Sequence, residues 1–363
     1  MIVYTKVLIA AINLMKMTGP IKAEMKVLDV IQSTGNTWVI VPGKIARQSK
    51  GRQSLFWNSR KGHALVQVDY AESVEDRIAL RVIRVYGSEI PSPGGSVSLS
   101  GWLGEHPEHF GLEGNFEEIV MPNQTRAWHF PAPSDKWVIH VHGRRAGMGE
   151  TLRNVEQFAN LGFRQLTISM ESDPKPFGLG KTKSNLGETE WDQIELAVLH
   201  AQSEGAKEIL LFGWSQGSFM IGQFLRNSKH VGKVRGAIFD SPLLDYRSTM
   251  QFHAKRAGLA RRLGDRVIDA IQDSKIVKLL GYRNVDVDGI ALNNKPVGVN
   301  IPYLILYSST DGHVESFDVH LFAGHNQDVT LVEIEGAKHC RLYNHDQERY
   351  QNSISQWLRQ HQI

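Results

Sequence analysis

The sequence predicts an α/β protein built on a mainly parallel, twisted sheet with helices on both faces. Two observations lead to this prediction. From about residue 115 onward, short apolar segments alternate with amphipathic segments of helical length, which is the pattern of parallel strands joined by covering helices. Polar residues with reactive side chains follow the carboxyl ends of these apolar segments. Parallel sheets bind their ligands at the edge that the carboxyl ends of their strands form.

Residues 1–114 are expected to form a small N-terminal α+β extension. The apolar stretch 7–15 is too short to span a membrane, and no convincing cleavage site follows it. We therefore expect a packed or loosely attached helix there, with membrane association or export as the alternatives. Alternating segments at 64–70 and 78–85 predict short strands.

Residues 115–363 are expected to form the main domain, and its elements follow in order. The predicted elements are a hairpin at 116–121 and 125–130, strands at 137–142, 164–169, 208–214, 234–239, 302–307 and 329–334, and helices at 151–160 and 188–203. Residues 243–301 interrupt this series with helical patterning. An insertion at that place would lie over the carboxyl edge of the sheet, so we expect it to form a cap.

A serine between two glycines follows the strand 208–214, in the run Gly213-Trp214-Ser215-Gln216-Gly217, and an apolar helix follows the run. This G-x-S-x-G pattern, placed between a strand and a helix, is typical of a nucleophile turn. The sharp turn exposes the serine hydroxyl at a helix N-terminus, where unpaired N–H groups can stabilise an oxyanion. The pattern therefore predicts Ser215 as a nucleophile.

A serine nucleophile needs a base and an orienting acid. Asp311 follows the strand 302–307, and His339 follows the strand 329–334. The chain order Ser215, Asp311, His339 is that of a hydrolase triad on a parallel sheet. Asp240, at the end of the strand 234–239, is the alternative acid. His313 is too near Asp311 in the chain to be the base, so we expect it to lie in the pocket or at a helix start.

The oxyanion hole is expected to use the backbone N–H groups of Gln216 and Arg144, the latter on the loop after the strand 137–142. His140 and His142 alternate onto one side of that strand, but no third ligand accompanies them, so we expect neither metal nor cofactor. Cys340 neighbours His339. We expect it to be a small buried side chain, with a cysteine nucleophile as the alternative.

These motifs resemble the α/β-hydrolase superfamily over residues 115–363. More narrowly, residues 137–143, 186–192, 213–215 and 239–242 resemble bacterial hydrolases related to the prolyl-oligopeptidase-like and lysophospholipase-like branches. The resemblance implies a serine hydrolase fold with triad roles at Ser215, Asp311 and His339, and it implies no substrate. The chain departs from that group at residues 170–173 and at Gln216.

Composition limits the partners. With 41 basic and 38 acidic residues the net charge is only +3, so nucleic acid is not an expected partner. One cysteine among 363 residues excludes an intrachain disulfide and fits a reducing, cytoplasmic compartment. We expect a small acyl substrate and cleavage of a carboxylic ester or thioester. Amide or short-peptide hydrolysis is the enzymatic alternative, and a catalytically silent binding protein is the alternative of another class.

The expected cap is rich in basic residues, which include Arg247, Arg256 and Arg261, with Asp265, Asp269 and Asp273 interspersed. These charges suit either a lid that steers an anionic or polar acyl substrate or a solvated helix surface. The interspersed carboxylates favour the solvated surface.

Overall fold

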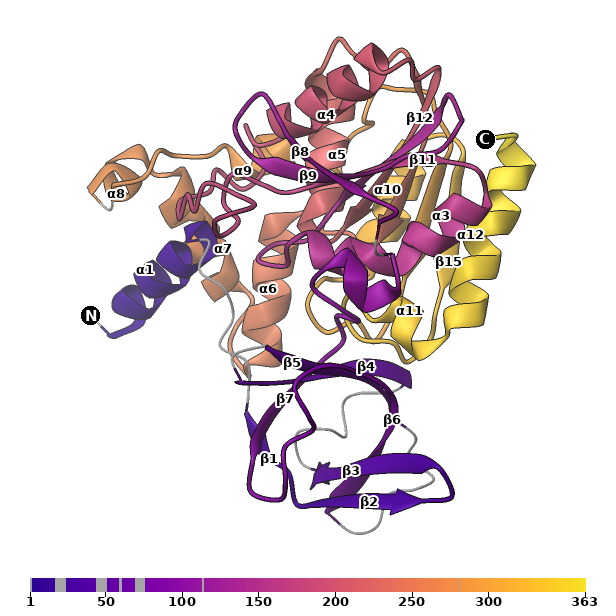
Figure 1. The fold of residues 1–363 in the computed structure, drawn as a ribbon. Coiled ribbons are helices and arrows are strands. Elements are labelled where there is room, and N and C mark those ends of the chain that lie inside the picture. The colour runs from indigo at the N-terminus through magenta and orange to yellow at the C-terminus, as the bar shows by residue number, and fades with distance from the viewer. Residues whose placement is uncertain are drawn as a thin grey trace.

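The computed structural model describes residues 2–16, 24–43, 51–58, 61–68, 76–112, 114–279 and 281–363. Residues 69 and 70 of one predicted strand and residue 280 of the expected cap lie outside these ranges. A central sheet of eight strands, in the order β15-β14-β13-β12-β10-β11-β9-β8, carries the main domain (Figure 1). Its strands are β8 (Glu117–Val120), β9 (Arg126–Phe130), β10 (Lys136–Val141), β11 (Arg164–Ile168), β12 (Glu208–Trp214), β13 (Val234–Asp240), β14 (Tyr303–Tyr307) and β15 (Val329–Glu333).

The strands from β10 to β15 pair in parallel, and the hairpin β8–β9 adds two antiparallel strands beside β11. The mainly parallel sheet predicted from the sequence is therefore present. Because neighbouring parallel strands end at one edge, the loops after β10, β12, β14 and β15 meet there. Those are the loops that carry the candidate site residues.

Helices cover both faces of the central sheet, as predicted. Along β12, Ile209 and Leu211 belong to one buried cluster, whereas Leu210 and Phe212 belong to another on the opposite face. The first cluster includes side chains of α4 (Asp192–Ser203), α5 (Gln216–Asn227) and α10 (Phe317–His325); the second includes side chains of α3 (Val155–Asn160), α11 (Leu342–His345) and α12 (Gln347–His361). This alternation places a core on each side of the sheet.

Two helices begin later than predicted. A 3-10 segment, η4 (Met148–Asn154), precedes α3 in place of one continuous helix. Helix α4 begins at Asp192 rather than near residue 188, because the Glu190 carboxylate holds the preceding loop in a turn. It accepts hydrogen bonds from the Ser184 hydroxyl (2.8 Å) and from the backbone N–H groups of Asn185 (2.6 Å) and Gly187 (3.1 Å).

The N-terminal region forms an antiparallel sheet of seven strands in the order β1-β7-β4-β5-β6-β3-β2. Its strands are β1 (Met25–Lys26), β2 (Asp29–Ser33), β3 (Asn36–Pro42), β4 (Gly51–Trp57), β5 (Gly62–Val68), β6 (Arg77–Gly87) and β7 (Ser96–Ser100). This sheet contacts the main domain through α11, where the Asn344 amide donates to the carbonyls of Arg52 and Gly101. The α11 helix begins three residues after His339, so the sheet supports the loop that carries it.

The N-terminal helix α1 (Ile2–Met15) packs on the cap and not on the N-terminal sheet (Figure 1). Its buried side chains recur at helical spacing at Val7, Ala11 and Leu14 and join the same apolar cluster as Ile268 and Ile271 of the cap. The extension expected over residues 1–114 therefore has its helix and its sheet in different places. No helix within the described ranges is both long and apolar enough to cross a bilayer.

The insertion between β13 and β14 is helical, as expected. It contains α6 (Tyr246–Arg256), α7 (Arg262–Gln272), α8 (Ser274–Leu279) and α9 (Val287–Ile290). Asp245 caps α6 by accepting from the N–H groups of Arg247 (2.7 Å) and Ser248 (3.2 Å). The Arg247 side chain then binds three carboxylates, those of Asp265, Asp269 and Asp288. This part of the basic surface is neutralised within the cap.

Candidate active site

Ser215 lies on a strained turn between β12 and α5. Its φ of 50° and ψ of −114° are sparsely populated for a residue with a side chain. The flanking glycines make the turn sterically allowed: a Cβ at Gly213 would lie 2.5 Å from the Ser218 nitrogen, and one at Gly217 would overlap the Val141 carbonyl. Only glycine fits at either position, which explains the spacing of the sequence pattern.

Ser215, His339 and Asp311 form one chain of hydrogen bonds. The Ser215 Oγ lies 2.9 Å from Nε2 of His339, and Nδ1 of His339 lies 2.8 Å from Oδ2 and 3.0 Å from Oδ1 of Asp311. The Asp311 carboxylate also accepts from the backbone N–H groups of His313 (2.8 Å) and Val314 (3.0 Å), which hold it in place. The structure thus brings together the three residues predicted for the triad.

Electrostatics within this chain favour a charged Asp311 and a basic His339. Burial alone would lower the pKa of His339, but the adjacent Asp311 carboxylate outweighs it and raises that pKa well above 6.5. Burial alone would raise the pKa of Asp311, yet the imidazolium of His339 lowers it below its usual value. A raised pKa makes His339 a stronger proton acceptor toward Ser215.

The alternative acid Asp240 has other partners. Its side chain accepts from the hydroxyls of Ser241 (2.9 Å) and Tyr350 (2.8 Å), and burial raises its pKa to about 6. Nδ1 of His339 donates its hydrogen bond to Asp311 instead.

Cys340 is buried, and burial raises the pKa of its thiol to about 11, so the thiol stays neutral and unreactive near pH 7.

The loop after β10 has a fixed peptide orientation. The Gly143 N–H donates to the Glu150 carboxylate (2.8 Å), and Nδ1 of His142 donates to the Gly143 carbonyl (2.8 Å). That carbonyl shares a peptide plane with the Arg144 N–H, so His142 sets the direction of this predicted oxyanion donor. In the described part of the chain, the N–H groups of Arg144 and Gln216 have no hydrogen-bond acceptor. Both are free to bind an oxyanion.

His142 belongs to a buried ion pair that the sequence analysis did not identify. Its Nε2 lies 2.8 Å from Oδ2 of Asp173, and both side chains are at most 8% exposed. Burial alone would lower the pKa of His142, but the Asp173 carboxylate outweighs it and raises the pKa to about 9. The signal in the sequence was Asp173 on the loop after β11, which lies beside β10. Asp173 belongs to residues 170–173, which the sequence analysis interpreted only as a departure from the pattern of the hydrolases that the chain resembles.

We expect this pair to make stability depend on pH. The His142 pKa is raised on folding, so its contribution is fully present below about pH 6.5 and is lost as the pH rises through about 9. Urea unfolding at pH 6 and at pH 9.5 should give a lower unfolding free energy at the higher pH, by an amount on the order of a few kcal/mol.

The matched control is the double variant His142→Asn, Asp173→Asn, which removes both charges together. His339 titrates in both proteins, so only the difference between their pH slopes reports the buried pair. Equal slopes in the two proteins would contradict the assignment of a protonated His142.

His140 is a core histidine. Its ring is fully buried beside Phe158 and Trp214, Nε2 lies 3.0 Å from the Gln165 side-chain oxygen, and burial lowers its pKa to about 4. It does not share a ligand set with His142. Among the described residues, no three histidine, cysteine or carboxylate side chains are grouped so as to hold a metal ion.

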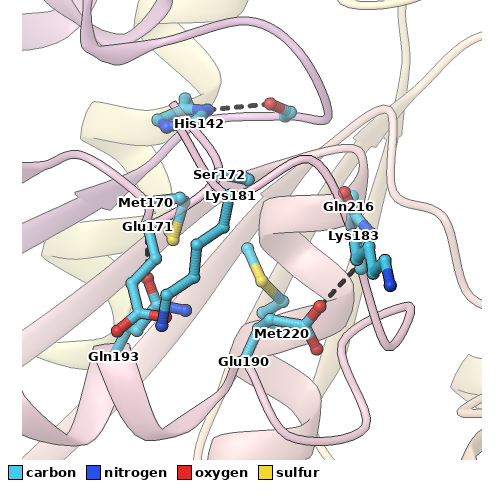
Figure 2. Close-up of a pocket in the computed structure, with 12 residues that line it drawn as sticks. His142, Met170, Glu171, Ser172, Lys181, Lys183, Glu190, Gln193, Gln216 and Met220 are labelled. Carbon is cyan, nitrogen blue, oxygen red and sulfur yellow. Dashed lines mark hydrogen bonds and ion pairs between the residues drawn. The ribbon is translucent and has the colours of Figure 1, made fainter. Parts of the chain in front are cut away.

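A pocket opens beside the turn at Ser215, on the side of the loop after β10 (Figure 2). It contains about 450 Å³ of empty space, open solvent included, and Gly143 and Gln216 form the part nearest to Ser215. Met170 and Met220 supply apolar side chains, whereas Ser215 and His339 do not line it. The pocket therefore extends away from the hydroxyl rather than over it.

The cations at this pocket already have partners. The Lys181 Nζ lies 2.5 Å from the Glu171 carboxylate, and the Lys183 Nζ donates to the Gly281 carbonyl (2.5 Å) and lies over the Tyr282 ring. These contacts leave the pocket polar at its mouth but without an unpaired lysine.

The Arg144 side chain binds the C-terminal end of α1. Its guanidinium donates to the carbonyls of Asn13 (2.9 Å) and Lys16 (3.0 Å), and the Arg145 guanidinium binds the same two carbonyls. Cationic side chains at a helix C-terminus satisfy carbonyls that have no partner within the helix. Arg144 thus combines a backbone N–H at the site with a side chain that fixes the N-terminal helix.

No protein-family model matches this sequence, and no curated protein sequence matches it. Several solved structures are similar to this chain. The esterase Pf2001 of Pyrococcus furiosus superposes with a TM-score of 0.52 at 19% identity, over 70% of this chain and 95% of that chain. The mouse alpha/beta hydrolase domain-containing protein 10 gives a TM-score of 0.49 at 15% identity, over 68% and 98% of the two chains. The esterase RhEst1 of Rhodococcus sp. ECU1013 gives 0.47 at 17% identity, over 68% and 98%.

Proposed function

Because the chain has the α/β-hydrolase fold, we propose that it is a serine hydrolase that cleaves a carboxylic ester or thioester. The observation that carries this proposal is the chain of hydrogen bonds from Asp311 through His339 to Ser215, which lies on a strained turn at a helix N-terminus. The three side chains come from three loops far apart in sequence. They meet at the carboxyl edge of the sheet, which is where parallel-sheet proteins bind their ligands.

The reaction proceeds in two acyl-transfer steps. His339 takes the proton from Ser215 as the Oγ forms a bond to the carbonyl carbon, and the N–H groups of Gln216 and Arg144 bind the oxyanion. His339 then gives this proton to the leaving oxygen or sulfur as its bond to the carbonyl carbon breaks. Water repeats the sequence on the acyl-enzyme and releases the acid. Asp311 holds the imidazole in the required tautomer throughout.

We assign the acyl half of the substrate to the pocket beside the loop after β10. Gly143 and Gln216 join this pocket to the proposed oxyanion donors, and Met170 and Met220 offer it apolar contacts. The carbonyl oxygen must face Gln216 and Arg144, and the leaving group must lie beside His339, so we assign the remaining substituent, the acyl chain, to this pocket. The polar mouth of the pocket favours a short acyl chain over a long one.

The test is a panel of p-nitrophenyl esters of increasing acyl length, with thioesters and aminoacyl p-nitroanilides measured in parallel. We expect turnover of esters or thioesters, with the highest rate for short acyl chains. Esters are tested first because the fold is shared with an esterase. Cleavage of anilides without cleavage of esters would favour the amide or short-peptide alternative. Labelling by a fluorophosphonate without turnover of either class would contradict the proposed ester hydrolysis, and no labelling would favour a catalytically silent binding protein.

A further inference from the structure

The imidazole rings of His313 and His253 form a wall beside His339. His313, on the loop that carries Asp311, has its ring centroid 5.0 Å from that of His339. His253, on the cap helix α6, has its ring centroid 5.9 Å from that of His313. The cap thus reaches the proposed general base through ring contacts that are tilted at His313–His339 and edge-on at His253–His313.

Arg256 continues this wall. It follows His253 by three residues on α6, so the two side chains share a helix face. Its guanidinium rests against Gly312, since a Cβ at that residue would lie 2.7 Å from Nη1. Its Cζ also lies 5.8 Å from the Phe252 ring centroid. Arg256 is therefore held against the residue between Asp311 and His313.

The charge of Arg256 is not compensated. Within the described ranges it has no carboxylate partner, whereas Arg247 binds three aspartates and Arg261 lies 3.8 Å from Glu315. Burial lowers the pKa of His313 to about 4 and also lowers that of His253, so both rings are neutral near pH 7. Arg256 is consequently the fixed cation of this wall, and its side chain is exposed to solvent.

The reaction geometry decides which half of a substrate meets this wall. His339 must protonate the leaving atom, so the leaving group lies beside its imidazole ring, and His313 is a neighbour of that ring. We propose that Arg256, with His253 and His313, forms the leaving-group subsite and that the preferred ester carries an anionic group on its alcohol or thiol half. This inference rests on the proposed serine hydrolase function and adds a substrate class to it.

Two esters with the same acyl group test the charge preference. The 4-carboxyphenyl ester has an anionic leaving group, and the 4-methoxycarbonylphenyl ester is its neutral counterpart. The neutral ester has the better leaving group, so the charge preference is read from the change in the ratio of the two kcat/KM values between wild type and variant. We expect Arg256→Gln to lower kcat/KM about 5- to 20-fold for the anionic ester and less than about twofold for the neutral one. Arg256→Lys should retain part of the preference, and added salt should reduce it in the wild-type protein.

Arg262→Gln is the matched control, because Arg262 is an exposed arginine at the start of α7 in the same cap. Circular dichroism and thermal melting establish that all variants are folded. If wild type and Arg256→Gln show the same ratio of anionic to neutral kcat/KM, the subsite is overturned while the hydrolase function stands. A wild-type protein that hydrolyses neither ester overturns both.

Discussion

Ser215→Ala is expected to abolish hydrolysis and leave the fold intact. The Ser215 Oγ is the proposed nucleophile, and its hydrogen bond is to His339, which other contacts hold in place. Loss of a triad serine lowers kcat by about 10⁴- to 10⁶-fold, because only oxyanion stabilisation and binding remain. The measurement is turnover of a short p-nitrophenyl ester, with fluorophosphonate labelling as a second readout.

Ser218→Ala is the matched control for this prediction. Ser218 is also buried near the turn, but its hydroxyl donates to the Gly213 carbonyl (2.7 Å) rather than to His339. Its loss should lower the unfolding free energy by about 1 kcal/mol and leave most of the turnover. The two variants are therefore expected to differ in opposite ways. Ser215→Ala should lose turnover but keep its stability, whereas Ser218→Ala should lose stability but keep most of its turnover. Hydrolysis that persists in Ser215→Ala would refute the nucleophile.

The α/β-hydrolase fold could be predicted because its main signals are local in the sequence. Each central strand is a short apolar run, and parallel strands buried on both faces need such runs. The turn around Ser215 was equally readable, because only glycine fits at residues 213 and 217. Asp311 and His339 could be placed because both follow strands whose ends must meet at one edge of the sheet.

Other features depend on contacts between distant segments and could not be predicted. The apolar pattern of α1 indicates a buried helix face but does not specify the cap as its partner. The ion pair of His142 and Asp173 joins loops 31 residues apart, and its strength comes from burial that only the fold creates. In the cap, the spacing of charges favoured a solvated surface. Arg247 binds aspartates nearby in the cap, and Arg256 is exposed to solvent, but the spacing of charges gave no sign that Arg256 also lies against Gly312 on the loop that carries Asp311.

The second large effect is expected at the acid of the triad. Asp311→Asn removes the charge that orients and stabilises the His339 imidazolium, and such a replacement lowers kcat by about 10⁴-fold. It should also change the pH profile. In the wild-type protein we expect kcat/KM to rise with pH as His339 loses its proton, through a pKa above 6.5. Without the Asp311 carboxylate, burial lowers that pKa, so the rise should move to lower pH.

Asp240→Asn separates the two candidate acids, because Asp240 also ends a central strand but bonds to Ser241 and Tyr350. The side-chain oxygen of an asparagine there can accept from one hydroxyl, and its NH2 group can donate to the other. A group that takes part in proton transfer contributes 10²- to 10⁴-fold, so we expect this variant to keep kcat within about tenfold of wild type and to keep the rise of kcat/KM with pH unchanged. Melting temperatures of both variants show whether either change acts through stability instead. If Asp240→Asn loses activity and shifts the pH profile while Asp311→Asn does neither, then the acid of the triad is Asp240, and the hydrogen bond between His339 and Asp311 serves structure alone.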